Sequence, residues 1–338
     1  MEQSATVLIS ILVPFKNTQD FLEECLVSII EQGYPHWEVL AVDDHSNDNS
    51  VEIVRRFSQS DPRIKLYPNK GHGIIEALRT AYDASRGTLI TRMDSDDVMV
   101  KDKLQVMAYS LQARGPGHVA IGQVRYFSDR GISNGYERYE QWLNQLTERG
   151  SNYGEIYKEC VIPSPCWMVY RNDLDACGAF DPDRYPEDYD LTFRFYEKGL
   201  RCIPCDQVLH LWRDYDTRTS RTSEHYAQNY FLDIKLHYFL RLDRDPKRTL
   251  TLWGAGSKGK EIAKGLIKKK VEFHWLCDNP NKIGKEIYGK HMYHYSKLKE
   301  LPQAQSIITV ANEEAQAMIR AYFAQMGQQP MTDYFFFC

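Results

Sequence analysis

The first hundred residues alternate between two hydrophobic periods, and this alternation constrains the fold more than any other feature of the sequence. Short apolar runs that are typical of buried strands lie at 7–15, 37–44, 63–69 and 88–94. Segments with the apolar spacing of amphipathic helices lie between them, at 20–33, 49–59 and 73–87. Strands that alternate with helices of this length form a mostly parallel sheet with helices on both faces. The sequence therefore predicts an α/β fold.

Length and charge limit the class of protein. At 338 residues the chain is long enough for two domains that each bury a core. Its net charge of -4 lacks the basic excess that binding to nucleic acid requires. No apolar run approaches the ~20 residues of a membrane-spanning helix, and the eight cysteines have no paired spacing. We expect a cytoplasmic protein, at most peripherally associated with the inner face of the membrane, and leave a homo-oligomer open.

A second strand–helix alternation near the C-terminus predicts a second domain. The first domain is expected to continue with strands at 164–171 and 201–215 and helices at 185–199 and 226–242. The charged segment 243–248, which Pro246 interrupts, is the best candidate for a linker. We therefore expect domains at 1–242 and 249–338, and the second is a smaller α/β domain.

Two acidic clusters follow strands of the predicted parallel sheet. Asp43 and Asp44 follow the second strand, and Asp94, Asp96 and Asp97 follow the fourth. Ligands bind at the carboxyl ends of the strands in such sheets, and carboxylate oxygens suit Mg²⁺ or Mn²⁺ that bridges a diphosphate. Each cluster alone could instead cap the helix that follows it. Two clusters at one edge of a sheet favour ligand binding.

Five motifs occur together in a recognisable order. They are VPFKN (13–17), VDDHSNDNS (42–50), NKGHGIIEALRTA (69–81), MDSDD (93–97) and EDYDLTFRF (187–195). Over roughly residues 7 to 222 the chain resembles a family 2 glycosyltransferase. The resemblance implies the GT-A fold and the transfer of a sugar from a nucleotide diphospho-sugar, often a UDP-sugar, to an acceptor hydroxyl with inversion. It also implies a glycan or lipid-linked glycan as acceptor, in the synthesis of a bacterial surface glycan.

The resemblance also implies roles for individual residues on the donor side. The residues that would bind the donor are Pro14, Phe15, Asn17, Asp44, Asn69, Arg79 and Asp94. Asp44 would read the base, and Asn69 with Arg79 would hold the nucleotide and diphosphate. Asp94 would favour the ribose and Asp96 the metal, which would be Mn²⁺ or Mg²⁺.

On the acceptor side the resemblance points to Asp188 as the catalytic base. The alternative, which we favour less, is a carboxylate that the dipole of the following helix stabilises. Further diphosphate or acceptor contacts are expected from Glu187, Trp167, Arg213, Arg218 and Arg221. Related enzymes often have a histidine, which can complete the metal site, where this chain has Tyr215.

Three glycines near the C-terminus form a G-x-G-x-x-G pattern. Gly254, Gly256 and Gly259 follow a predicted strand and open a helix, and Asp278 ends the next strand. This pattern is typical of a nucleotide site, and the segment resembles the Rossmann-like domain appended to some family 2 glycosyltransferases. The same glycines could serve only to let the strand and helix pack closely.

Three other classes of protein compete with a glycosyltransferase. One is a nucleotide-binding, NAD(P)-binding or sensing protein that acts through residues 246–338. A nucleotidyltransferase would need a glycine-rich phosphate loop after the first strand, and PFKNTQDF lacks one. A glycan-binding module with a decayed site is disfavoured by the presence of Asp94, Asp96 and Asp188.

Overall fold

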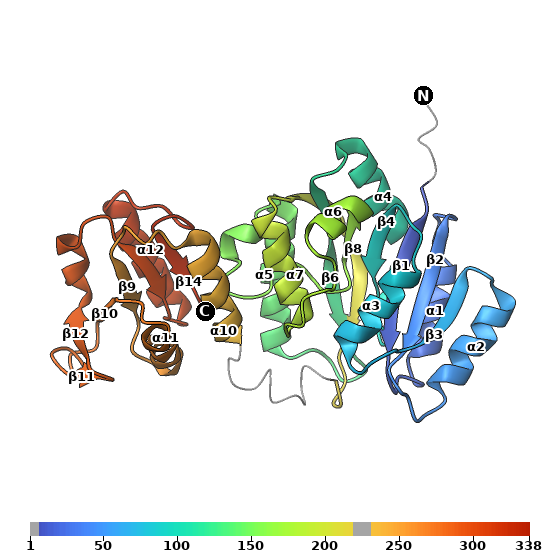
Figure 1. Cartoon of the computed structure of the whole chain (residues 1–338), viewed down its shortest axis with the longest axis horizontal. Coiled ribbons are helices and arrows are strands. Elements are labelled where there is room, and N and C mark those ends of the chain that lie inside the picture. Colours follow the sequence, from blue (N-terminus) through green and yellow to red (C-terminus); the bar gives the residue numbers. More distant parts are fainter. Residues whose placement is uncertain (1–6, 219–230) are drawn as a thin grey trace. The chain divides into compact units, whose positions relative to one another are not determined.

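A computed structural model describes residues 7–218 and 231–338, and it divides into two units (Figure 1). The first unit contains the residues up to Tyr153 together with Val161–Asp216. The second contains Gly154–Cys160 and the residues from Thr217 onward. None of the described helices is both long enough and apolar enough to cross a membrane.

The described part of the first unit is built on an eight-stranded sheet with the order β3-β2-β1-β4-β7-β6-β8-β5. The strands are β1 (Ile9–Phe15), β2 (Trp37–Asp43), β3 (Ile64–Pro68), β4 (Leu89–Arg92), β5 (Val98–Met99), β6 (His118–Phe127), β7 (Trp167–Tyr170) and β8 (Arg201–Arg213). β1 to β4 are parallel to one another, as the alternation predicted. β7 is antiparallel to both β4 and β6 and so joins the parallel half to the rest of the sheet.

Helices connect these strands. They are α1 (Leu22–Ile30), α2 (Ser50–Ser60), α3 (Ile74–Ala84), α4 (Lys103–Arg114), α5 (Asn134–Arg149), α6 (Arg171–Ala176) and α7 (Glu187–Glu197), with a 3-10 turn at Asn152–Glu155. Every residue of β1 is buried, because helices cover both faces of the sheet at its centre. β6 was not predicted from the sequence, although it is among the longest strands of the sheet.

The second unit is a smaller α/β unit with the strand order β11-β12-β10-β9-β13-β14. Its strands are β9 (Leu250–Trp253), β10 (His274–Cys277), β11 (Glu286–Ile287), β12 (Lys290–His294), β13 (Gln305–Ile308) and β14 (Tyr334–Phe336). Its helices are α10 (Phe231–Tyr238), α11 (Ser257–Lys268) and α12 (Glu313–Gln325), with a π-helical turn at Phe239–Asp243 and a 3-10 turn at Tyr295–Glu300. All its strand pairs are parallel except that of β11 with β12.

The second unit begins earlier in the chain than the sequence analysis expected. α10 lies against α11, where a Cβ added to Gly265 would lie only 2.6 Å from Leu236. The ring of Tyr157 stacks on Phe337 at 5.3 Å, and its hydroxyl donates to Asp243. These contacts assign both 154–160 and α10 to the second unit, so the segment 243–248 lies inside that unit rather than between domains. Residues 226–230 of the expected helix lie outside the described residues.

Gly87 offers a test of the close approach between β1 and the start of β4. A Cβ at Gly87 would lie 2.5 Å from the Ser10 nitrogen and 2.9 Å from the Leu8 oxygen, both backbone atoms. We expect Gly87→Ala to lower the free energy of unfolding by about 1–3 kcal/mol, since the two strands must move apart. Urea denaturation measures this change. Gly135→Ala in α5 is the control, because its nearest neighbour would be 3.9 Å away; an equal loss in both variants would contradict the explanation.

Candidate active site

Loops that follow three neighbouring strands bring polar side chains to one edge of the first sheet. β1 pairs with β2 as far as Phe15 and Asp43. The main-chain pairing continues beyond these strands, since the Asp44 N–H donates to the Phe15 carbonyl over 2.9 Å and the Met93 N–H donates to Leu12 over 2.9 Å. The loops that carry the two acidic clusters therefore begin beside the end of the same strand, β1.

Asp44 is buried and firmly held. Its Oδ1 accepts hydrogen bonds from Asn69 Nδ2 at 2.7 Å and from the Gly73 N–H at 2.9 Å. Lys16 Nζ lies 3.3 Å from its Oδ2. Burial raises the pKa of Asp44, but the hydrogen bonds from Asn69 and Gly73 and the charge of Lys16 outweigh it, so the pKa lies below its ordinary value. The carboxylate is thus ionised and fixed in orientation at neutral pH.

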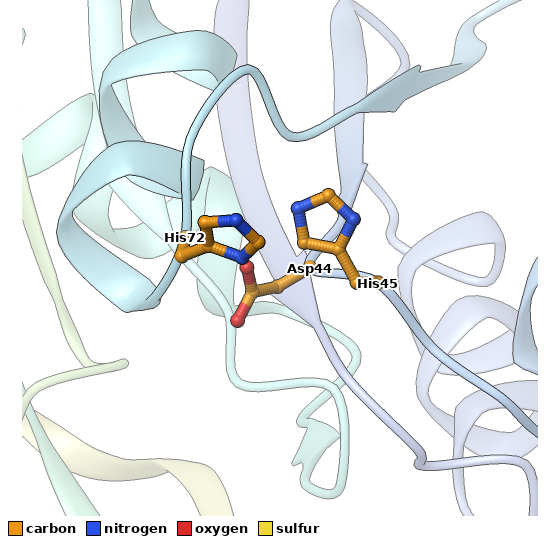
Figure 2. Close-up of side chains that lie close together, drawn as sticks. All are labelled: Asp44, His45 and His72. Atoms are coloured by element: carbon orange, nitrogen blue, oxygen red, sulfur yellow. The ribbon is translucent and has the colours of Figure 1, made fainter.

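Two histidines that the sequence analysis did not single out lie beside Asp44. Figure 2 shows the imidazole rings of His45, from the loop after β2, and His72, from the loop before α3, close to the carboxylate. One ligand atom from each of the three side chains lies within 4.8 Å of the others. His45 Nε2 lies 2.8 Å from the Gly71 carbonyl, which orients its ring. One carboxylate with two imidazoles is a ligand set that suits Zn²⁺ or a similar transition metal better than Mg²⁺.

Each of the two D-x-D carboxylates is held by another side chain of the first unit. Asp94 Oδ1 accepts from Arg92, with Nε at 3.0 Å and Nη2 at 2.9 Å. Asp96 Oδ2 accepts from the Tyr215 hydroxyl at 2.8 Å. The Arg213 Nε donates to the Asp96 carbonyl at 2.8 Å and so braces the loop. Tyr215 therefore contacts the second carboxylate of the motif directly.

Asp97 has a different role from the helix cap that the sequence allowed. Its side chain is fully buried, and it lies 2.9 Å from His210 Nε2 and accepts the Arg213 N–H at 2.8 Å. His210 Nδ1 in turn lies 3.3 Å from the Nζ of the buried Lys103, whose pKa burial lowers. Asp102 makes no capping hydrogen bond at the start of α4 either. Asp97 instead joins the D-x-D loop to β8.

Arg92 connects the D-x-D loop to the start of α7. Its side chain is 8% exposed, and its guanidinium pairs with Asp94 at 2.9 Å and with Glu187 Oε1 at 2.7 Å. Asp188, next along the first turn of α7, is half-buried, and its carboxylate accepts the Tyr189 N–H at 2.7 Å. Loss of hydration and the Glu187 charge raise the pKa of Asp188 to about 7, although Arg92 opposes the rise. A carboxylate with such a pKa can accept a proton near neutral pH.

Three further residues predicted to bind the donor lie at the end of β1. Pro14 and Phe15 are buried, and Phe15 is part of the apolar core. Asn17 has a left-handed backbone with φ 53°, and its Oδ1 accepts the Asn47 N–H at 2.8 Å. Asn17 thus ties the loop after β1 to the loop that follows Asp44.

Two predicted contacts point elsewhere in the fold. The Arg79 guanidinium donates to the carbonyls of Phe180 at 2.7 Å and Asp181 at 2.6 Å, and it also pairs with Glu76. The Trp167 side chain is 3% exposed and packs edge-on against Phe195 with a centroid distance of 5.8 Å. Both side chains therefore have structural contacts of their own.

The remaining predicted residues lie toward the C-terminus. Arg218 is half-buried and directly precedes the residues that are not described, whereas Arg221 lies outside the described residues. In the second unit, Gly254, Gly256 and Asp278 line one cavity, and Gly259 packs against Gly254.

Comparison with known proteins identifies the family. A family model described as glycosyl transferase family 2 matches residues 10–178. The UDP-Glc:alpha-D-GlcNAc-diphosphoundecaprenol beta-1,3-glucosyltransferase WfgD of Escherichia coli is 37% identical over 61% of this chain and 77% of its own length. The glycosyltransferase GlyA of Streptococcus pneumoniae is 26% identical over 61% of this chain, but the match spans only 30% of GlyA. The chain belongs to glycosyltransferase family 2.

Solved structures identify the fold. Residues 1–349 of Staphylococcus aureus TarS, in complex with UDP-GlcNAc, align with a TM-score of 0.55 and 19% identity. The alignment covers 70% of this chain and 68% of the TarS chain. The first unit therefore has the GT-A fold, which the resemblance of its motifs implied.

The double ion pair of Arg92 can be tested through stability. We expect Arg92→Met to lower the free energy of unfolding by about 3–5 kcal/mol, because it leaves Asp94 and Glu187 without their cation in a poorly hydrated site. Adding Glu187→Gln should recover part of this loss, because it removes one unpaired charge. Denaturant unfolding of both variants measures the difference, with Arg56→Met as a control at an exposed ion pair. A double variant no more stable than Arg92→Met would contradict this explanation.

Proposed function

We propose that this protein transfers a sugar from a nucleotide diphospho-sugar, most simply a UDP-sugar, to a hydroxyl of a glycan or lipid-linked glycan. The transfer inverts the anomeric carbon and serves the synthesis of a bacterial surface glycan. One observation carries the proposal: Arg92 pairs with both Asp94 and Glu187, so the D-x-D loop and the first turn of α7 form one site. The names of WfgD and TarS, one a UDP-Glc enzyme and the other solved with UDP-GlcNAc, support this choice of donor.

On the donor side, Asp44 would accept a hydrogen bond from an N–H of the base. Its carboxylate is ionised and held by Asn69 and Gly73, so little freedom is lost when a base binds. Lys16 is exposed and its ammonium group lies beside Asp44. When a base takes the place of this ammonium group, Lys16 can turn toward a phosphate. Arg79 would support this side indirectly, through its hydrogen bonds to the loop at 180–181.

Asp94 and Asp96 fit a divalent cation of the Mg²⁺ or Mn²⁺ type. Such ions are commonly held by one or two carboxylates together with the phosphates of the substrate. Arg92 and Tyr215 each hold one oxygen of these carboxylates and so orient the pair. A bound cation would neutralise the charge that develops on the diphosphate as the anomeric bond breaks.

On the acceptor side, Asp188 would act as the base. The acceptor oxygen attacks the anomeric carbon, its proton passes to the Asp188 carboxylate, and the nucleoside diphosphate leaves with the electrons of the broken bond. The raised pKa of Asp188 matches this task, because a base works best when its pKa is near the working pH. Glu187, held by Arg92, would orient the acceptor or the loop.

A donor screen tests the first half of the proposal. We expect Mn²⁺ with at least one UDP-sugar to raise the melting temperature, and a chelator to remove the effect. Asp96→Ala should weaken the metal-dependent donor affinity by roughly tenfold or more, about 1.4 kcal/mol, whereas Asp83→Ala on the exposed face of α3 should not. Differential scanning fluorimetry and calorimetry measure both effects. The absence of a response to every donor, or an unchanged affinity in Asp96→Ala, would refute the proposal.

The pH dependence of transfer tests the role of Asp188. Only its ionised form can take a proton, so kcat/KM should rise about tenfold per pH unit below about pH 7 and level off above it. Asp188→Asn should lower kcat by roughly 10²–10⁴-fold and leave donor binding intact.

Glu187→Gln gives this prediction a sharper control. The Glu187 charge raises the pKa of Asp188, so its removal should move the midpoint of the profile to lower pH. Steady-state rates between pH 5 and 9 measure the midpoint of the profile for each variant, and donor affinities show whether the variant still binds the donor. If Asp188→Asn loses donor binding together with transfer, the residue is structural rather than the base.

A further inference from the structure

The second unit contains a cavity at the carboxyl ends of β9, β10 and β13, with a volume of about 370 Å³. β9 lies between β10 and β13, so the order of the strands reverses at this point. In open α/β sheets ligands bind in the crevice where the strand order reverses. None of the residues proposed above for sugar transfer lies in this cavity.

The three glycines of the G-x-G-x-x-G pattern have different reasons to be glycine. A Cβ at Gly259 would lie 2.2 Å from the Gly254 oxygen, and a Cβ at Gly254 would lie 2.3 Å from Thr309 Oγ1. Packing therefore explains Gly254 and Gly259. Gly256 is exposed, has the ordinary extended φ of -78°, and would have no described atom within 4 Å of an added Cβ. It lines the cavity, and the lack of a side chain keeps its backbone open to a ligand.

The charges around the cavity are arranged with a positive end, formed by Lys258 and by Lys282, and an acidic end, formed by Asp278. The Lys282 Nζ donates to the Ala255 carbonyl at 2.6 Å. α11 begins at Ser257, and no side chain caps it, so its first N–H groups and its dipole favour an anion there. Lys258, in the first turn, also lines the cavity, and it forms no hydrogen bond or ion pair with any residue of the described segments. Asp278, at the end of β10, lines the cavity too and likewise has no such partner within 7–218 or 231–338. A phosphate on one side and a sugar hydroxyl on the other would match these two ends.

The other helix beside the cavity differs from α11. The loop from β13 to α12 contains Val310, Ala311 and Asn312 and has no glycine. Asn312 Oδ1 accepts the Ala315 N–H at 2.8 Å and so caps α12 with a side chain of the protein. Of the two described helices that begin at the cavity, only α11 therefore has an N-terminus available for a phosphate.

We propose that this cavity binds one nucleoside diphosphate. Its phosphates would lie on the Gly256 backbone and the N-terminus of α11 beside Lys258, and Asp278 would accept a hydrogen bond from a ribose hydroxyl. This second site is independent of the proposed donor site in the first unit, and it would make the protein bind two nucleotides.

Calorimetry on the full chain carrying Asp44→Ala and Asp96→Ala tests the proposal, with EDTA present so that metal-dependent donor binding is absent. ADP, UDP, GDP and NAD are the probes. We expect one of the three nucleoside diphosphates to bind with a stoichiometry of one and more tightly than NAD. Gly256→Val, which fills the cavity, and Lys258→Met should each weaken this binding at least tenfold. Lys260→Met, on the same helix but outside the cavity, should not change it.

Melting curves of each variant establish that the second unit remains folded. Absence of binding by all three nucleoside diphosphates to a folded protein would overturn the proposal, as would unchanged binding in both Gly256→Val and Lys258→Met. Tighter binding of NAD than of all three nucleoside diphosphates would overturn the assignment to a single nucleotide. Failure of the donor screen would leave this result unaffected, because the measurement uses a protein whose donor site is already disabled.

Discussion

The organisation of the acidic edge depends on the Arg92 guanidinium, which pairs with Asp94 at the end of β4 and with Glu187 at the start of α7. These two carboxylates are 93 positions apart in the sequence, and with Asp188 they form a cluster of like charges in a poorly hydrated place. A planar guanidinium can donate to two carboxylates in fixed directions, which a lysine ammonium does less well. The cation therefore lets the two halves of the proposed site approach each other before any substrate binds.

The negative charges of the other carboxylates at this edge are offset by different neighbouring groups, and these neighbours determine what each carboxylate can do. Asp97 is fully buried against His210 and the Arg213 N–H, so its role is to hold the loop. Asp44 is buried beside the exposed Lys16, and Asp96 is half-buried; hydrogen bonds from Asn69 and from Tyr215 fix the orientation of these two carboxylates. Asp188 has the raised pKa, because the nearby cation only partly offsets Glu187 and the loss of hydration. Crowded carboxylates thus acquire different protonation behaviour from their neighbours rather than from the motif.

The sequence predicted the parts of the fold that depend on local patterns. The parallel arrangement of β1 to β4 follows from the alternation of strand and helix periods in the sequence. The acidic edge follows from the aspartates that come directly after β2 and β4. Contacts between distant residues carry no local signal, which is why the pairing of Asp97 with His210 and the direction of Arg79 toward Phe180 were not predicted. His45 and His72 are single histidines in two loops, and only the pairing of β2 with β3 brings those loops together. The assignment of 154–160 to the second unit likewise rests on a stack of aromatic rings that no spacing rule reveals.

Several helices of the described chain begin at the carboxyl edge of a parallel sheet, and the first turns of α3, α12 and α11 are satisfied in different ways. At α3, the N–H of Gly73 donates to Asp44, so a carboxylate of the protein already uses this terminus. At α12, Asn312 fills the same role. At α11 no side chain does so, and Lys258 in its first turn lines the cavity without a hydrogen bond or ion pair to any of the described residues. An anion bound there would offset the partial positive charge of the N-terminus of α11, which no side chain caps. The glycine pattern alone could not separate packing from binding, because Gly254 and Gly259 satisfy it for steric reasons; the open position at Gly256 and the uncapped helix together favour binding.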